Sequence, residues 1–197
     1  MTERKLSSAD YLRDFARQNP RFSTAIVMDA RAFAKGRGER VKIQTRTDAV
    51  LQILRLCWVT DAFTSLLFHR LKVSLYARGI PVIPMVLHKL SNLLGSVQIG
   101  RPVIMEGGVY MPHGYVVIDG MTKIGSGAVI RPFVTIGLKD GDFNGPVLGR
   151  DVSVGTGAKI IGPVSIGDAA RIGAGAVVTA DVPAGRTAVG VPARLAD

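Results

Sequence analysis

Residues 160–178 have the sequence IIGPVSIGDAARIGAGAVV, in which an aliphatic residue recurs every six positions. The same spacing extends through most of the second half of the chain. Its positions are Ile99, Met105, Met111, Ile118, Ile124, Ile130, Ile136, Leu148, Val154, Ile160, Ile166, Ile172 and Val178. A period of six matches neither the 3.6-residue period of a helix nor the simple alternation of a strand. It is typical of a repeat protein.

Each six-residue unit has room for one short strand and one turn, and three such units close a triangular coil. One aliphatic residue per unit then points inward and stacks on its equivalent in the next coil. Four residues after most of these positions lies a small or β-branched residue that suits a tight inner corner: Val103, Val109, Thr122, Ala128, Val134, Val152, Ala158, Val164, Ala170 and Ala176. The pattern predicts a mainly β protein, a parallel β-solenoid of four to five coils over residues 96–197 with a C-terminal tail.

Residues 1–95 carry helical rather than six-residue spacing and form a separate α-helical N-terminal region in this interpretation. We expect helices at 8–18 and 21–34, and helical structure over 48–78 that starts near Asp48 and breaks at Thr60 or Asp61. Residues 80–84, with two prolines, predict a turn, and a last helix should cover 85–94. His69 and His88 lie in these helices, where an isolated histidine is usually a packing or surface residue.

Composition limits the function classes. The formal net charge is +10 and the sequence pI about 10.3, but lysine and arginine are scattered and no nucleic-acid-binding motif is present. A nucleic-acid partner is therefore not expected, whereas a polyanionic small ligand would suit the charge. The single cysteine, Cys57, excludes an intramolecular disulfide and favours a reducing, cytoplasmic location. We expect neither a signal peptide nor a transmembrane segment.

The six-residue pattern has two interruptions. The step from Met111 to Ile118 is seven residues long, and the extra residue falls within Pro112-His113-Gly114-Tyr115. An added residue makes a corner bulge outward and re-aims a side chain, and His113 is the only histidine of the solenoid. The second interruption, residues 138–146, loses the aliphatic pattern. It predicts an exposed loop that could fold over a cleft.

A single histidine beside a loop is typical of general-base catalysis, because imidazole can remove a proton from a hydroxyl near neutral pH. Backbone N–H groups of a glycine-rich turn could hold the oxyanion of an acyl transfer. Glu106 and Asp119 are both candidates to orient the His113 ring. The competing interpretations are a turn residue bonded to backbone, a non-catalytic scaffold, and a zinc hydratase, which would need about three histidines.

The pattern I-G-x-x-A/V, residues 172–178 (IGAGAVV), 181–183 (DVP) and 190–194 (GVPAR), together with residues 66–71 (LLFHRL), resemble the serine acetyltransferases. These belong to the hexapeptide-repeat acyltransferases, whose fold is a left-handed parallel β-helix. The resemblance implies an acetyl-CoA-dependent O-acetyltransferase without a metal, in which an acceptor hydroxyl attacks the thioester directly. It implies His113 as the general base. It also implies a homotrimer with shared clefts, or two trimers paired through their helices.

The family's motifs place further residues in the site. The resemblance assigns the pantetheine groove to Gly137, Leu138, Thr156 and Ala174, with Arg194 near the nucleotide end. Asp48 aligns with an acidic residue of a family D-P-A segment. With Tyr115, Arg131 and Asn144, it completes the predicted acceptor-binding residues.

The acceptor stays open between two classes. The family favours L-serine or a serine-like molecule. However, Pro112 stands where the family has an acidic residue, and Asn144-Gly145-Pro146 aligns with a family R-H-P segment. Residues 111–118 look closest to a branch found in polysaccharide biosynthesis, which favours a sugar or polysaccharide hydroxyl. A non-catalytic scaffold is the alternative to both.

Overall fold

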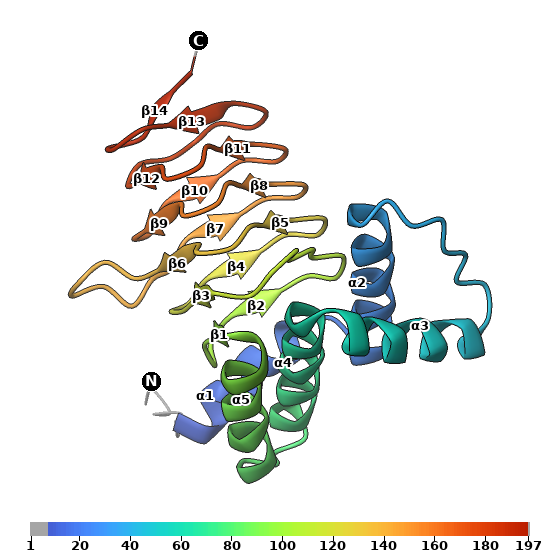
Figure 1. Ribbon diagram of the computed structural model, residues 1–197. Helices are drawn as coiled ribbons and strands as arrows, with labels where there is room; N and C mark the ends of the chain where they lie inside the picture. The colour runs from blue at the N-terminus through green and yellow to red at the C-terminus, as the bar shows by residue number, and fades with distance from the viewer. Residues whose placement is uncertain (1–7, 197) are drawn as a thin grey trace.

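The computed structural model describes residues 8–196 of the chain. Five helices come first, below and beside a stack of coils (Figure 1): α1 Ser8–Gln18, α2 Phe22–Gly36, α3 Arg46–Val59, α4 Asp61–Ala77 and α5 Val82–Gly95. The first strand begins at Val97, directly after the last helix. None of the helices in the described part of the chain is both long and apolar enough to cross a bilayer.

The helix boundaries follow local capping. Thr60 is extended, and its side chain accepts a hydrogen bond from Phe63 N at 3.2 Å, so the helical segment divides there as predicted. The start of α3 differs from the prediction: Thr45 is the N-cap, and Asp48 is its partner in a capping box. The prediction of a turn through Pro84 is also wrong, because α5 already begins at Val82. Proline is tolerated in the first turn of a helix, where its missing N–H costs nothing.

The strands form three sheets, which are the faces of a triangular prism. Face A contains β1 Val97–Ile99, β3 Val116–Ile118, β6 Thr135–Gly137, β9 Lys159–Ile161 and β12 Val177–Val178. Face B contains β2 Ile104–Met105, β4 Lys123–Ile124, β7 Val147–Leu148 and β10 Ser165–Ile166. Face C contains β5 Val129–Ile130, β8 Ser153–Val154, β11 Arg171–Ile172, β13 Thr187–Val189 and β14 Arg194–Leu195. Neighbouring strands are parallel except the final pair, β13 and β14, so the chain is a β-helix with N-terminal helices.

The inward aliphatic residues are the core of this prism. All thirteen predicted positions are at most 3% exposed, and the ten small or β-branched corner residues are at most 6% exposed. Equivalent residues pair from coil to coil, as Ile118 does with Ile136 and Ile160 with Val178. The six-residue pattern therefore predicted both the inward positions and their stacking partners.

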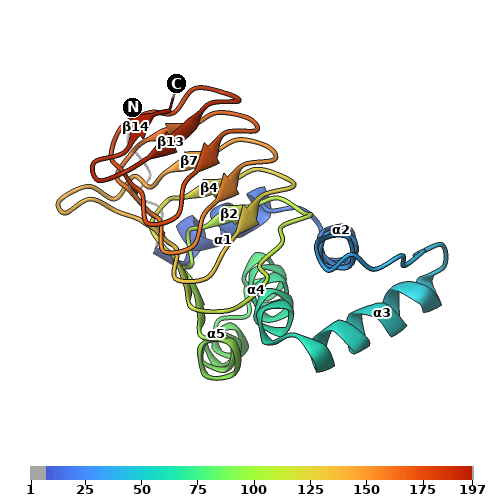
Figure 2. The same cartoon turned by 45° about the horizontal axis from the view of Figure 1, so that its top comes forward.

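The registers locate both interruptions. Ile99 pairs with Ile118, which makes the first coil one residue longer than the next. Ile136 pairs with Ile160, so the coil that contains residues 138–146 is six residues longer. These extra residues form a loop between β6 and β7 that projects away from the coils (Figures 1 and 2).

A buried ion pair joins the helices to the first coil. Arg70 of α4 donates from Nε to Asp29 Oδ2 of α2 at 2.9 Å, and both side chains are at most 3% exposed. Asp29 Oδ1 also accepts from Gly108 N at 2.8 Å and Val109 N at 3.0 Å. The Arg70 guanidinium donates to the carbonyl groups of Met105 and Glu106. Both charges are therefore satisfied by groups from two helices and the base of the solenoid.

We expect Arg70→Met to lower the free energy of unfolding by about 3–5 kcal/mol, because it leaves the buried Asp29 carboxylate without its cation. The matched control is Arg150→Met, which removes the exposed Arg150–Asp168 pair and should cost at most about 1 kcal/mol. Urea unfolding followed by circular dichroism measures both. Equal losses in the two variants would contradict this role for the buried pair.

Candidate functional site

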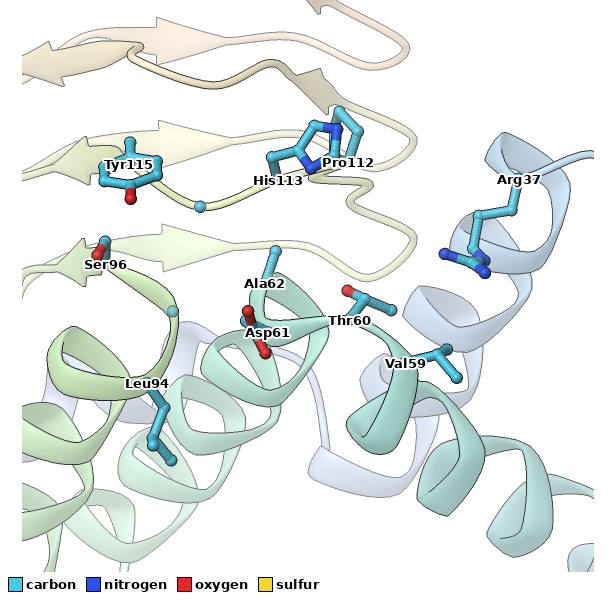
Figure 3. A pocket seen from close by; sticks show the side chains of 12 residues that line it. Arg37, Val59, Thr60, Asp61, Ala62, Leu94, Ser96, Pro112, His113 and Tyr115 are labelled. Atoms are coloured by element: carbon cyan, nitrogen blue, oxygen red, sulfur yellow. The ribbon is translucent and has the colours of Figure 1, made fainter.

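His113 lies on an exposed corner between faces C and A, at the mouth of a cleft of about 290 Å³. The cleft separates the first corner of the solenoid from the helices beneath it (Figure 3). Its lining residues are Arg37, Val59, Thr60, Asp61, Ala62, Leu94, Gly95, Ser96, Pro112, His113, Gly114 and Tyr115. The bulged corner therefore presents its histidine outward, as its extra residue predicted.

Two close contacts fix this corner against the end of α5. A side chain at Gly114 would collide with the carbonyl oxygen of Gly95, so only glycine allows this approach. Ser96 adopts a left-handed conformation with φ 50° as the C-cap of α5, and its carbonyl accepts a hydrogen bond from Val116 N at 3.2 Å. The depth of the cleft is thus set by the backbone.

Charged groups of both signs reach the cleft from the helices (Figure 3). Asp61 is the first residue of α4, so its carboxylate lies at the positive end of that helix. Arg37 follows α2, and its Nε donates to Glu39 Oε1 at 2.8 Å. Glu39 also accepts from Arg55 at 2.7 Å, and these two arginines lower the pKa of Glu39 to about 2. Two guanidinium groups and the ionised Glu39 therefore leave one positive charge on the Arg37 side, which balances the Asp61 carboxylate.

This arrangement suits proton removal from a small polar acceptor. His113 is solvent-accessible at the cleft, and Asp61 is the acidic side chain that lines the cleft with it. Thr60, Asp61 and Ala62, at the N-terminus of α4, line the same cleft, so the positive end of this helix could stabilise developing negative charge there. Within residues 8–196, no cluster of three or more histidine, cysteine, aspartate or glutamate side chains could hold a metal ion.

The corner that carries His113 repeats in every coil with the same backbone conformation. Tyr115, Phe133, Gly157 and Gly175 occupy equivalent positions, and their φ values are 60°, 62°, 74° and 67°. Left-handed φ favours glycine and is strained for a bulky aromatic residue. The two coils nearest the cleft thus hold aromatic residues where the two upper coils hold glycine.

The two aromatic side chains form an exposed stacked pair. The ring centroids of Tyr115 and Phe133 are 5.1 Å apart with an interplanar angle of 19°, and the residues are 60% and 55% exposed. Strained residues cluster at ligand sites because the strain must be offset by a function or by packing. Because more than half of each side chain is exposed, burial does little to offset this strain, and we treat the two rings as part of the candidate site.

Two predicted cofactor residues, Thr156 and Ala174, lie higher on the same corner. Gly157 N donates to Pro132 O at 2.9 Å, and Gly175 N donates to Thr156 O at 2.8 Å, so the successive corners stack directly. Thr156 and Ala174 are both exposed. A continuous edge therefore runs from His113 upward past these two residues.

Other predicted residues lie elsewhere in the chain. Gly137 ends β6 and Leu138 follows it, so both lie at the opposite edge of face A from His113. Asn144 lies in the adjoining loop and is bonded to Asp142. No residue of this loop lines the His113 cleft of the same chain. Arg131 donates to Ser153 Oγ, and Arg194 lies on β14.

The helical residue predicted for acceptor binding is also remote. Asp48 lies in the first turn of α3 as the capping-box partner of Thr45, whereas the opposite end of that helix, Val59, lines the cleft. Of the candidates to orient His113, neither Glu106 nor Asp119 lines the cleft. The site roles of Asp48, Glu106 and Asp119 therefore remain predictions, because a single chain does not place these residues in the cleft.

Asp61 and Arg37 are the charged lining residues that the sequence did not single out. The sequence pattern indicates Asp61 only as a possible helix break, and Arg37 lies just beyond the helix predicted at 21–34. A residue directly after an N-cap is exposed at a helix terminus, and this signal could have marked Asp61. Nothing in the sequence places either of them beside residue 113, because that proximity depends on how the helices pack.

Comparisons with known proteins agree on one family. Residues 145–180 match the bacterial transferase hexapeptide (six repeats) family. A serine acetyltransferase from Synechococcus elongatus is 40% identical over 148 residues, and the chain spans 59% of its length. One from Helicobacter pylori strain J99 is 40% identical over 134 residues, which are 66% of this chain and 78% of the relative.

The fold of the chain is also similar to that of a solved serine acetyltransferase structure. The serine acetyltransferase of Neisseria gonorrhoeae, in complex with serine, superposes with a TM-score of 0.74 and 27% identity. The match covers 92% of this chain and 71% of that chain, so it includes the helices as well as the solenoid.

The strained aromatic pair yields a test that separates ligand binding from stability. We expect Tyr115→Gly and Phe133→Gly to leave the free energy of unfolding within about 1 kcal/mol, because relief of left-handed strain offsets the flexibility of glycine. Ala169→Gly is the matched control, since Ala169 has φ 56° at another corner. Only the two aromatic variants should raise the KM of the acceptor. A loss above about 2 kcal/mol in either would mean that the pair is structural.

Proposed function

The chain belongs to the serine acetyltransferase family of hexapeptide-repeat transferases, and from this we propose that it is an acetyl-CoA-dependent O-acetyltransferase with His113 as general base. The observation that carries the proposal is the exposed His113 on the bulged corner of the His113 cleft, in a chain 40% identical to serine acetyltransferases. We take the solenoid to be left-handed, as in that family.

The proposed reaction is a direct transfer. His113 accepts the proton of the acceptor hydroxyl as its oxygen bonds to the carbonyl carbon of the acetyl thioester. The tetrahedral intermediate then collapses, the carbon–sulfur bond breaks, and the protonated His113 returns its proton to the departing thiolate. The products are the O-acetyl ester and coenzyme A, and no covalent enzyme intermediate is needed.

The electrostatics of the cleft support this chemistry. The N-terminus of α4 and Arg37 provide positive potential where the oxyanion would form. Asp61 supplies a carboxylate that could orient an imidazolium or hold a cationic group of the acceptor. In this proposal Asp61 takes the role that the sequence assigned to Glu106 or Asp119.

We further propose a homotrimer in which each site is shared by two chains. His113 and the groove residues Gly137 and Leu138 lie at opposite edges of face A. They can serve one site only if a second chain brings its groove edge to the first chain's His113 edge. Repeating that contact around a threefold axis closes a ring. The exposed apolar face of α3, with Trp58 at 90% and Leu54 at 62% exposure, offers a further contact for pairing two trimers.

Two acceptor classes remain in the proposal, each with its own support. L-serine or a serine-like molecule is supported by the relatives and by the charges of Asp61 and Arg37, which suit an ammonium and a carboxylate. A sugar hydroxyl is supported by the exposed aromatic pair Tyr115 and Phe133, because an aromatic face attracts the C–H groups of a sugar ring. A cytoplasmic location is part of the proposal and rests on the single Cys57.

Transfer of a labelled acetyl group from acetyl-CoA tests the reaction. Wild-type protein is assayed with L-serine, N-acetylglucosamine and a nucleotide-linked sugar, and at least one should be acetylated. His113→Ala should lower kcat about 10²–10⁴-fold while acetyl-CoA binding is retained. Lys123→Gln, a change of an exposed residue on face B, should have no effect. Equal rates for the wild type and His113→Ala would support the non-catalytic scaffold instead.

Mixing two inactive variants tests the shared site. Gly137→Trp should block the groove with little disturbance of the chain's own fold, because a Cβ atom added at Gly137 meets no heavy atom within 4 Å. Co-expression of Gly137→Trp with His113→Ala leaves about one interface in four with both intact edges, so about a quarter of the activity should return. Activity that stays absent, with mixed oligomers confirmed by mass spectrometry, would mean that each site lies within one chain.

A further inference from the structure

A second pocket, of about 210 Å³, lies away from the His113 cleft. It is enclosed by α4, α5 and the turn after β1, and we call it the basic pocket. Its lining residues are Lys72, Tyr76, Met85, His88, Lys89 and Arg101. Four of these six side chains are basic, and the proposed acetyl transfer uses none of them.

The buried Lys72 forms no salt bridge with any carboxylate among the side chains that the structure describes. It is 3% exposed, and its Nζ donates to the carbonyl oxygens of Ile99 at 2.5 Å and Gly100 at 3.4 Å. The ion pairs found among the side chains of residues 13–196 do not include Lys72. A buried charge is normally paired, because removal from water is costly. The third N–H of the ammonium group remains for a partner in the pocket.

The other basic groups add to this unpaired charge. The Arg101 guanidinium lies over the Tyr76 ring, 5.8 Å from its centroid. Burial lowers the pKa of Lys72 to about 8, and Arg101 contributes to the shift. Burial and the charges of Lys72 and Arg101 also lower the pKa of His88. Asp119 opposes both shifts, but one carboxylate does not balance this group of cations.

The same positive charges affect the pKa of the neighbouring His69. It is 2% exposed, and neither ring nitrogen has a hydrogen-bond partner in the described part of the chain. Burial, together with the charges of Lys72, Arg70 and His88, holds its pKa well below the usual range. An imidazole ring is neutral or cationic, so His69 does not balance the positive charges of the pocket.

We propose that the basic pocket binds a phosphate group, held by Lys72, His88 and Arg101. A tetrahedral dianion accepts hydrogen bonds in several directions at once, so an ammonium, an imidazolium and a guanidinium can all donate to it. Tyr76 and Met85 add apolar lining to the pocket, and Lys72, at 3% exposure, lies where low local polarity strengthens charge-assisted bonds. Lys89, exposed at the rim, adds long-range attraction for the anion.

The phosphate could be free or part of a larger ligand. Ser96 lines the His113 cleft and Gly100 lies beside Lys72, and only the three residues of β1 separate them, about 10 Å of strand. The helices α4 and α5 likewise line the cleft with one end and the basic pocket with the other. The phosphate group of a larger ligand such as coenzyme A could therefore enter the pocket. The alternative occupant is inorganic phosphate that is not attached to any larger molecule.

Isothermal titration of the full-length protein with inorganic phosphate at pH 7 tests the proposal. We expect saturable binding of one phosphate per chain. Arg101→Gln and His88→Gln should each weaken it about tenfold, the effect of losing roughly one charge-assisted hydrogen bond. Lys123→Gln is the matched control and should bind like the wild type. Lys72 is left unchanged because its replacement could unfold the chain. The absence of saturable binding, or equal affinities in all four proteins, would overturn the proposal.

A competition arm distinguishes the two sources of phosphate. Displacement of phosphate by coenzyme A would assign the pocket to the phosphate of a larger ligand, whereas independent binding would assign it to free phosphate. Both outcomes support a phosphate site. Binding is measured without any turnover, so the result does not depend on whether the chain transfers acetyl groups.

The pH dependence of sulfate binding tests the role of His88, because sulfate keeps its two charges across the range used. His88 faces Lys72 and His69 of α4, Arg101 after β1, Asp119 after β3 and Lys89 of its own helix. A bound dianion favours protonated His88, so affinity should rise as the pH falls from 7.5 towards 5.5, about the range of histidine titration. His88→Gln should remove most of this rise and leave only the small part near pH 7.5 that Lys72, with its pKa of about 8, contributes. An equally large rise in His88→Gln would contradict the assigned role.

Discussion

The structure depends on the inward stacking of one aliphatic side chain per six residues. A single unit of six residues buries almost nothing alone, so each coil is stable only because the next coil covers it. This constraint fixes the register of every strand pair from Ile99 to Val178. It also restricts variation to the corners, because a residue added within a strand would move the aliphatic side chains out of the core. The corner at His113 and the loop at 138–146 are the places where the chain adds residues without breaking the stack.

The sequence predicted this part of the fold in detail because the six-residue period states the inward positions directly. It also predicted an outward-facing His113, because the stacked aliphatic residues fill the interior and an extra corner residue must bulge outward. It failed where position depends on packing between distant elements. Arg37 and Asp61 reach the cleft only because α2 and α4 are joined to the first coil by the Asp29–Arg70 pair, and no local pattern encodes that contact. The prediction places the start of α5 at residue 85, whereas the helix begins at Val82. Pro84 indicates a turn in the sequence, but the first turn of a helix also accepts proline.

The chain distributes its ionisable groups unevenly. Where Asp29 meets Arg70, buried charges are paired and fully bonded, whereas Lys72 is buried with only carbonyl partners. The first arrangement holds the helices in place, and the second leaves positive charge facing a pocket. The corners of the solenoid show a similar contrast in backbone conformation. Most positions with left-handed φ hold glycine, but Tyr115 and Phe133 have left-handed φ and carry aromatic rings near the cleft. A buried lysine without a carboxylate partner and an aromatic residue with left-handed φ both lower stability. Such residues are expected where a protein binds a ligand.

The central claim is that the bulged corner presents His113 to a thioester held along an edge of the solenoid. A crystal structure of the oligomer with coenzyme A tests it most directly. The account predicts the thiol sulfur about 6 Å from the His113 imidazole, with space for one acceptor hydroxyl between them. It also predicts that the pantetheine arm follows the stacked corners past Thr156 and Ala174 of one chain and the Gly137 edge of its neighbour. A thiol bound far from His113, or at a site formed within one chain, would contradict the account.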